Sequence, residues 1–95
     1  MPPFPLLAQW AHGEHVDSNL LRLYTRRLRE VDPRTLRADF LACDAFDRRG
    51  EVGRIMTPTL ILCGDVDRMT PVKFSQFLHE QIAGSQWIVV PGAGH

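Results

Sequence analysis

The sequence has few of the features that mark membrane-spanning, secreted or nucleic-acid-binding proteins. Its 95 residues include only two cysteines and 8% aromatic residues, and 11 basic side chains balance 11 acidic ones. No apolar run approaches the ~20 residues that a membrane-spanning helix needs. The opening Met-Pro-Pro-Phe-Pro lacks the basic and apolar regions of a signal peptide. We therefore expect a cytoplasmic protein with no membrane or nucleic-acid partner.

The two cysteines and the arginines support the same interpretation. Cys43 and Cys63 fall in an expected helix and an expected buried strand, where cysteine packs as a small apolar residue in a reducing compartment. Six arginines lie between residues 22 and 37, a density that also occurs in nucleic-acid-binding proteins. Acids accompany them, and no aromatic residues are interleaved for base stacking. A solvated helix face is therefore favoured.

The first 16 residues give little structural signal. Pro2, Pro3 and Pro5 disfavour an early helix. His12 and His15 have the spacing of a zinc-binding pair and stand near Glu14, but no further ligands follow. A solvated loop is the preferred interpretation, and we predict neither a metal nor a cofactor.

Two amphipathic helices are predicted next. Asp17-Ser18 caps a helix that runs to about Val31, and Asp32-Pro33 supplies the cap and first residue of a second helix ending near residue 46. Apolar residues recur at helical spacing along both. They are Leu20, Leu21, Tyr24, Leu28 and Val31 in the first helix, and Leu36, Phe40 and Ala42 or Cys43 in the second.

The remaining residues predict a strand, a helix and a second strand. The uncharged run 59–63 between Pro58 and Gly64 indicates a buried strand. Thr70-Pro71 is expected to cap a helix that ends at Gly84, and the apolar run 87–90 forms the next strand. Such a βαβ unit is right-handed, so the two strands are expected to be parallel.

Chemistry-bearing residues follow each predicted strand. Asp65 and Asp67 come after the first strand, and His95 comes after the second. The carboxyl ends of parallel strands share one sheet edge, which is where open α/β sheets place their chemistry. His95 would act as general base and Asp67 would orient its imidazole, two members of a nucleophile–His–acid triad. We interpret Asp65 as a turn residue whose carboxylate bonds local amides.

Residues 45–95 resemble the C-terminal part of α/β-hydrolase-fold enzymes. Gly64 and Asp67 match the family's G-x-x-D segment, which carries the triad acid, and Gly92-Ala93-Gly94-His95 matches the segment that carries the triad histidine. The resemblance implies an α/β fold in which a helical lid precedes a parallel βαβ unit. Residues 1–50 would be the lid and residues 51–95 the end of the core. Trp10, Tyr24 and Phe40 would pack the lid onto that core, an interpretation favoured over contact with substrate.

The nucleophile is not apparent in the sequence. The family's G-x-S-x-G elbow is absent, because none of Ser18, Ser75 and Ser85 has glycines at both flanking positions. The sequence therefore predicts a fragment of a hydrolase whose full-length form cleaves an ester or lactone in a small-molecule substrate. By itself the chain is expected to be inactive. The alternative is a non-catalytic remnant or interaction module of the same fold.

Overall fold

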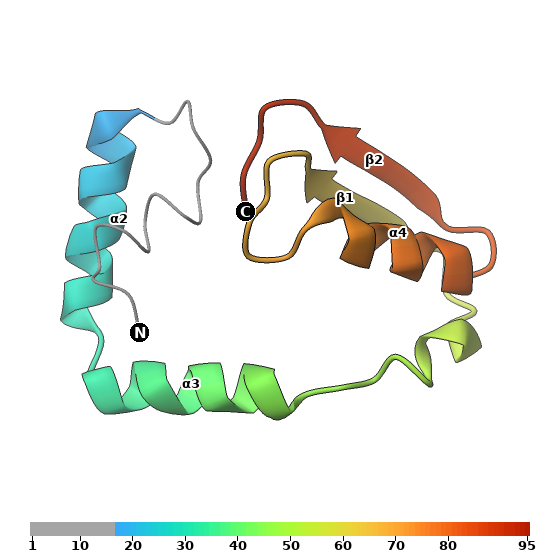
Figure 1. The fold of residues 1–95 in the computed structure, drawn as a ribbon, viewed down its shortest axis with the longest axis horizontal. Coiled ribbons are helices and arrows are strands. Elements are labelled where there is room, and N and C mark those ends of the chain that lie inside the picture. Colours follow the sequence, from blue (N-terminus) through green and yellow to red (C-terminus); the bar gives the residue numbers. More distant parts are fainter. Residues whose placement is uncertain (1–16) are drawn as a thin grey trace.

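The computed structural model describes residues 17–95 as two helices followed by a βαβ unit (Figure 1). The interpretations made for Trp10, His12 and His15 lie outside the described residues. The elements in chain order are α2 (Ser18–Glu30), α3 (Pro33–Ala45), the short 3₁₀ helix η1 (Val52–Arg54), β1 (Leu60–Gly64), α4 (Val72–Gln81) and β2 (Gln86–Val90).

Local side-chain bonds begin α2 and α3 where the sequence predicts. The Asp17 carboxylate accepts a hydrogen bond of 2.7 Å from the Asn19 amide, and the Asp32 carboxylate accepts one of 2.9 Å from the Arg34 amide. Both aspartates are N-caps, and proline fills the first position of α3. These bonds satisfy amides that a helix start leaves without an intrahelical partner.

The two helices pack against none of the other described helices or strands, as the open arrangement in Figure 1 shows. Their apolar side chains therefore stay largely in solvent: Leu41 is 52% exposed and Phe46 70% exposed. Two expectations are wrong for this reason. Cys43 is exposed rather than part of a core, and Phe40 does not pack onto the βαβ unit. None of the described helices has both the length and the apolar character that crossing a membrane requires.

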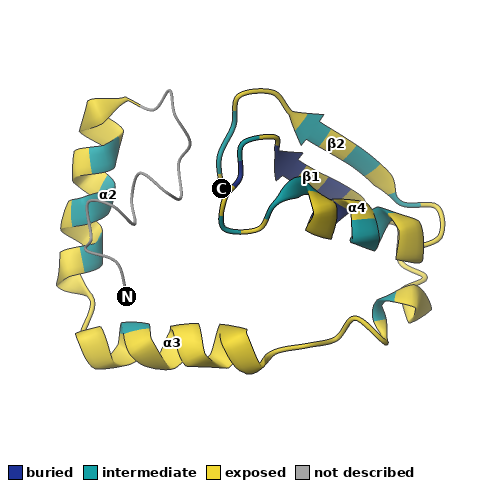
Figure 2. Ribbon diagram, in the orientation of Figure 1, coloured by how far each residue is buried: buried dark blue, intermediate teal, exposed yellow. Residues whose placement is uncertain are grey.

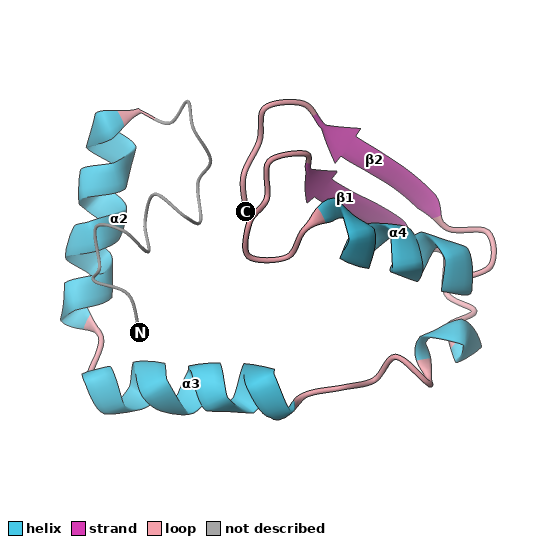
Figure 3. Cartoon of the chain, in the orientation of Figure 1, coloured by secondary structure: helices cyan, strands magenta, loops and turns pink. Residues whose placement is uncertain are grey.

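The βαβ unit contains the buried core. Its strands pair in parallel, with Leu60 opposite Gln86 and Gly64 opposite Val90, as predicted. The alternation of side chains along β1 places Ile61 and Cys63 in the core and leaves Leu60 and Leu62 exposed. Helix α4 packs against both strands (Figure 3), and the buried residues of Figure 2 cluster where it meets β1. The two strand ends are thereby fixed next to each other.

Candidate active site

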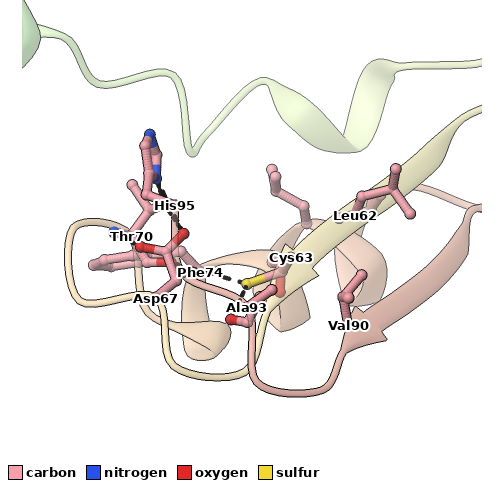
Figure 4. A pocket seen from close by; sticks show the side chains of 13 residues that line it. Leu62, Cys63, Asp67, Thr70, Phe74, Val90, Ala93 and His95 are labelled. Atoms are coloured by element: carbon pink, nitrogen blue, oxygen red, sulfur yellow. Dashed lines mark hydrogen bonds and ion pairs between the residues drawn. The ribbon is translucent and has the colours of Figure 1, made fainter. Parts of the chain in front are cut away.

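The candidate site lies at the carboxyl ends of β1 and β2, where two loops meet (Figure 4). Residues 65–71 connect β1 to α4, and residues 91–95 follow β2. The structure brings the predicted pair together: His95 Nδ1 lies 3.0 Å from Asp67 Oδ2. Twenty-eight residues separate the two in sequence, so the parallel pairing of the strands produces this contact.

Both carboxylate oxygens of Asp67 have hydrogen-bond partners. Its Oδ1 accepts from the amides of Met69 at 3.0 Å and Thr70 at 2.9 Å. Its Oδ2 accepts from the Thr70 hydroxyl at 3.1 Å and faces His95. The Asp67 side chain is only 6% exposed. A carboxylate fixed in this way can orient a neighbouring imidazole.

These contacts also set the charge of Asp67. Burial is the largest single influence and raises the pKa of the carboxyl group by penalising its charged form. Hydrogen bonds from the Thr70 amide, from His95 and from the Thr70 hydroxyl outweigh it together and hold the pKa below its ordinary value. Asp67 is therefore an anion at neutral pH, and a carboxylate anion can only accept hydrogen bonds.

The two ring nitrogens of His95 have different surroundings: Nδ1 contacts Asp67, and Nε2 does not. Since the Asp67 carboxylate only accepts, Nδ1 of His95 is the donor in this contact, and in the neutral imidazole Nε2 then has a lone pair. The imidazole is 48% exposed, and Figure 4 shows its second nitrogen pointing away from Asp67. Nε2 can therefore take a proton from a group that approaches from outside the βαβ unit.

Thr70 has a role that the sequence did not indicate. It was expected to cap α4, but α4 begins at Val72 and its N-cap, Pro71, makes no side-chain cap bond. The Thr70 hydroxyl instead lies 3.1 Å from Asp67 Oδ2 and 3.2 Å from His95 Nδ1. It donates to the carboxylate and sits beside the imidazole, so it closes a three-membered polar cluster.

Asp65 also differs from its predicted role. Its carboxylate was expected to bond amides of its own turn, but Oδ1 accepts from the Gly92 amide at 2.7 Å, 27 residues further along the chain. The turn residue of the first loop is therefore bonded to the loop that carries His95. Only the tertiary structure places these loops side by side.

A largely apolar pocket of about 530 Å³ adjoins Asp67 and His95. Its walls include Leu62, Phe74, Leu78 and Val90. Ser75 also lines this pocket, but its hydroxyl donates to the Val72 carbonyl at 2.9 Å and accepts from Trp87 Nε1 at 3.0 Å. Ser75 is thus engaged in the core and is not hydrogen-bonded to His95. Across residues 17–95, no three or more metal-ligating side chains are grouped around a possible ion site.

Comparisons with known proteins found sequence relatives and solved structures that are similar to the chain. No family model matches the chain. Two pimeloyl-[acyl-carrier protein] methyl ester esterases of Neisseria meningitidis, from serogroup B strain H44/76 and serogroup A strain Z2491, are each 28% identical over 90 residues, 95% of this chain. The chain spans 35% and 29% of their respective lengths.

Two solved structures share the chain's architecture. An esterase from Exiguobacterium antarcticum matches with a TM-score of 0.89 and 23% identity, covering 97% of this chain and 34% of its own. A serine hydrolase of carbazole degradation, CarC, matches with a TM-score of 0.69 and 17% identity, covering 97% of this chain and 38% of its own.

Proposed function

Because the chain has the fold of the C-terminal part of an α/β-hydrolase, we propose that it supplies the acid and general base of an enzyme that hydrolyses carboxylic esters or lactones. The observation that carries this proposal is the 3.0 Å contact between His95 Nδ1 and a buried Asp67 carboxylate at the ends of two parallel strands. Asp67 would be the orienting acid and His95 the general base. The esterases among the sequence relatives support ester hydrolysis as the reaction.

The proposed reaction follows from the protonation of the His95 imidazole and the Asp67 carboxylate. His95 Nε2 takes the proton of a nucleophile hydroxyl as its oxygen attacks the ester carbonyl carbon. The Asp67 carboxylate stabilises the imidazolium that forms. His95 then gives this proton to the leaving alkoxide as the carbon–oxygen bond breaks, which yields an acyl-enzyme. Water attacks the acyl carbon, loses a proton to His95, and the nucleophile oxygen recovers that proton when the acid departs.

None of the serines in residues 17–95 is hydrogen-bonded to His95, so a serine hydroxyl would come from another segment of the protein. Ser75 is committed to Trp87 and Val72, Ser85 bonds His79, and Ser18 lies in α2. The curated relatives are about three times as long as this chain, which leaves room for such a segment. We propose that the nucleophile is a serine in that part of the protein.

The pocket supports a substrate with an apolar acyl chain. Leu62, Phe74 and Val90 offer hydrocarbon surface beside Asp67 and His95, and burial of each methylene of an acyl chain is worth about 0.8 kcal/mol. The Neisseria relatives are named for an ester borne by an acyl-carrier protein. We propose a small-molecule acyl ester as the minimal substrate, and an ester presented on a carrier protein as its physiological form.

Initial rates on para-nitrophenyl butyrate test the function in the protein as its gene encodes it. His95→Ala is expected to lower kcat by about a hundred- to ten-thousandfold, because general acid–base catalysis contributes on the order of 10²–10⁴. Asp67→Asn is expected to follow in the same direction. His79→Ala is the matched control. His79 lies in the last turn of α4 and is hydrogen-bonded to Ser85, outside the Asp67–His95 pair. Equal rates for the wild type and His95→Ala would contradict the proposal and favour a non-catalytic module.

A further inference from the structure

We propose that Asp65 is a positioning residue that holds the 91–95 loop so that His95 meets Asp67. The inference rests on the proposed function, because it assigns Asp65 a task in the same site. Asp65 touches neither His95 nor Asp67 through its side chain in any hydrogen bond of the structure. It acts through the backbone of the loop, at the residue three positions before His95.

Three hydrogen bonds join the loop after β1 to the last residue of β2 and to the loop that follows it. The Asp65 amide donates to the Val90 carbonyl at 3.1 Å, and the Val66 amide donates to the Ala93 carbonyl at 3.0 Å. These two bonds continue the pairing of the strands beyond their ends. The third is the 2.7 Å bond from the Gly92 amide to Asp65 Oδ1, the shortest of the set. A charged acceptor makes it the strongest type among the three.

The 91–95 loop fits against the end of β1 only because the last residue of that strand, Gly64, has no side chain. A Cβ atom built on Gly64 would lie 2.5 Å from the Gly94 carbonyl oxygen and 2.6 Å from the Ala93 carbonyl carbon. Gly92 turns the chain with φ of 70°, a left-handed conformation that glycine adopts without steric cost. The 91–95 loop therefore packs against the backbone of Gly64 and is hydrogen-bonded to the Asp65 carboxylate.

His95 needs such support because the backbone before it and the surroundings of its side chain restrict its position little. Two of the three residues before it are glycines, which have the largest backbone freedom to lose on ordering. Its imidazole is 48% exposed, so packing alone does not fix the ring. The loop anchor at Gly92 therefore determines whether the bond to Asp67 is maintained.

The two acids of this loop have different tasks despite their separation of one residue. Asp67 is buried and bonds the imidazole itself. Asp65 is exposed and bonds the backbone that carries the imidazole. Loss of Asp67 would remove the partner of His95, whereas loss of Asp65 would leave that partner in place and allow His95 to move away from it.

Two variants of Asp65 separate the acceptor from its charge. Asp65→Ala removes the acceptor for the Gly92 amide, while Asp65→Asn keeps a side-chain oxygen that can accept the same bond. Asp44→Asn is the matched control, because it removes an exposed carboxylate from α3. All variants are made in the protein as its gene encodes it.

A misplaced general base costs on the order of a hundredfold in rate, so Asp65→Ala should lower kcat about ten- to hundredfold with KM little changed. Asp65→Asn should retain at least about a third of the activity, on the same geometric argument.

A spectroscopic measurement tests the positioning without reference to turnover. Histidine labelled with ¹⁵N reports which ring nitrogen carries the proton. In the wild type, His95 should be protonated at Nδ1 when neutral, because it donates to Asp67. Asp65→Ala should shift His95 toward a mixture with the Nε2-protonated form, whereas Asp65→Asn and Asp44→Asn should leave the wild-type pattern. Circular dichroism should show unchanged helix content in all three variants.

The two measurements fail in different ways. If the wild type hydrolyses no ester but the tautomer shifts in Asp65→Ala, the proposed function is wrong and the positioning stands. If the enzyme is active and Asp65→Ala matches the wild type in both kcat and tautomer, the positioning role is overturned. Gly64→Ala gives a second check, because displacing Ala93 and Gly94 should produce the same tautomer shift with Asp65 intact.

Discussion

The helical region (residues 18–45) and the βαβ unit (residues 60–95) are built by the same local rules but differ in what stabilises them. Side-chain caps at Asp17 and Asp32 start α2 and α3, yet neither helix buries a residue. In the βαβ unit α4 has no side-chain cap, but it packs on both strands and encloses Ile61, Cys63 and Ile82. Local capping therefore specifies where a helix begins, whereas burial specifies where it lies.

The polar contacts of the candidate site and the ion pairs around α2 and α3 also differ in how far apart in sequence their partners lie. The contacts of His95 with Asp67 and with Thr70 depend on the two strands being parallel and adjacent. The ion pairs of the region around the two helices instead join residues two to four positions apart, as in Arg27 with Glu30 and Arg49 with Asp47. Such exposed local pairs contribute little to stability. They position nothing outside their own turn.

The largest expected effect concerns what the βαβ unit lacks. The purified 95-residue chain holds the acid and the base but no serine bonded to His95, so it should give no turnover of para-nitrophenyl butyrate above the buffer rate. The measurement is an initial-rate assay at high protein concentration, with His95→Ala as the control. Turnover by the chain that disappears in His95→Ala would contradict this expectation and would mean that a nucleophile lies within these residues.

Proteolysis should reveal the next largest contrast between the two regions. Segments with few buried contacts open locally at little cost, so trypsin should cut at the arginines of α2 and α3 well before it cuts after Lys73 in α4. Mass spectrometry of a time course identifies the order of cleavage. Simultaneous cleavage in both regions would show that the βαβ unit is no more stable than the helices that precede it.

Truncation of one side chain in each region should give unequal losses of stability. Ile82 is 4% exposed, so Ile82→Ala should lower the free energy of unfolding by about 2–4 kcal/mol, through lost burial and a new cavity. Leu41 is 52% exposed, and Leu41→Ala should change it by less than about 0.5 kcal/mol. Urea denaturation followed by the fluorescence of Trp87, in a Trp10→Phe background, measures both. Equal losses would show that α3 contributes to the folded core.

The smallest expected effect is a difference in how two carboxyl groups respond to salt. The side-chain hydrogen bond from Arg49 is the main cause that lowers the pKa of exposed Asp47 to about 2, and dissolved ions screen such a pair. The pKa of Asp67 is lowered by hydrogen bonds from Thr70 and His95, and its side chain is only 6% exposed, so dissolved ions screen it less. Raising the salt concentration should therefore raise the pKa of Asp47 and leave that of Asp67 nearly unchanged, as measured by ¹³C NMR titration. An equal rise at both sites would show that Asp67 is open to solvent.

The lowered pKa of Asp67 also gives the βαβ unit a dependence on pH. The unfolded chain binds a proton at Asp67 near the ordinary value of 3.8, and the folded unit binds it only at lower pH. The stability that Asp67 contributes is therefore fully present above that value and is lost as pH falls through the folded pKa. Asp67→Asn should remove this part of the acid sensitivity.

The sequence alone determined the order of elements and the edge at which the chemistry lies. Aspartates before Ser18 and Pro33 mark helix starts, and the two short apolar runs, separated by a helix, require parallel strands. Both are local or chirality rules, so they can be read from residues close together in the chain. They also placed Asp67 and His95 at one sheet edge.

Only the tertiary structure decided what each side chain near that edge does. The sequence could not show that Asp65 bonds Gly92, that Thr70 bonds Asp67 rather than capping α4, or that Cys43 is exposed while Cys63 is buried. The Asp65 bond depends on two segments that meet across 27 residues, and the Thr70 hydroxyl also lies beside His95, 25 residues away. The two cysteines differ because β1 packs against α4, whereas α3 packs against none of the other described elements. Periodicity specifies an apolar face, but the packing of other elements decides whether that face is covered.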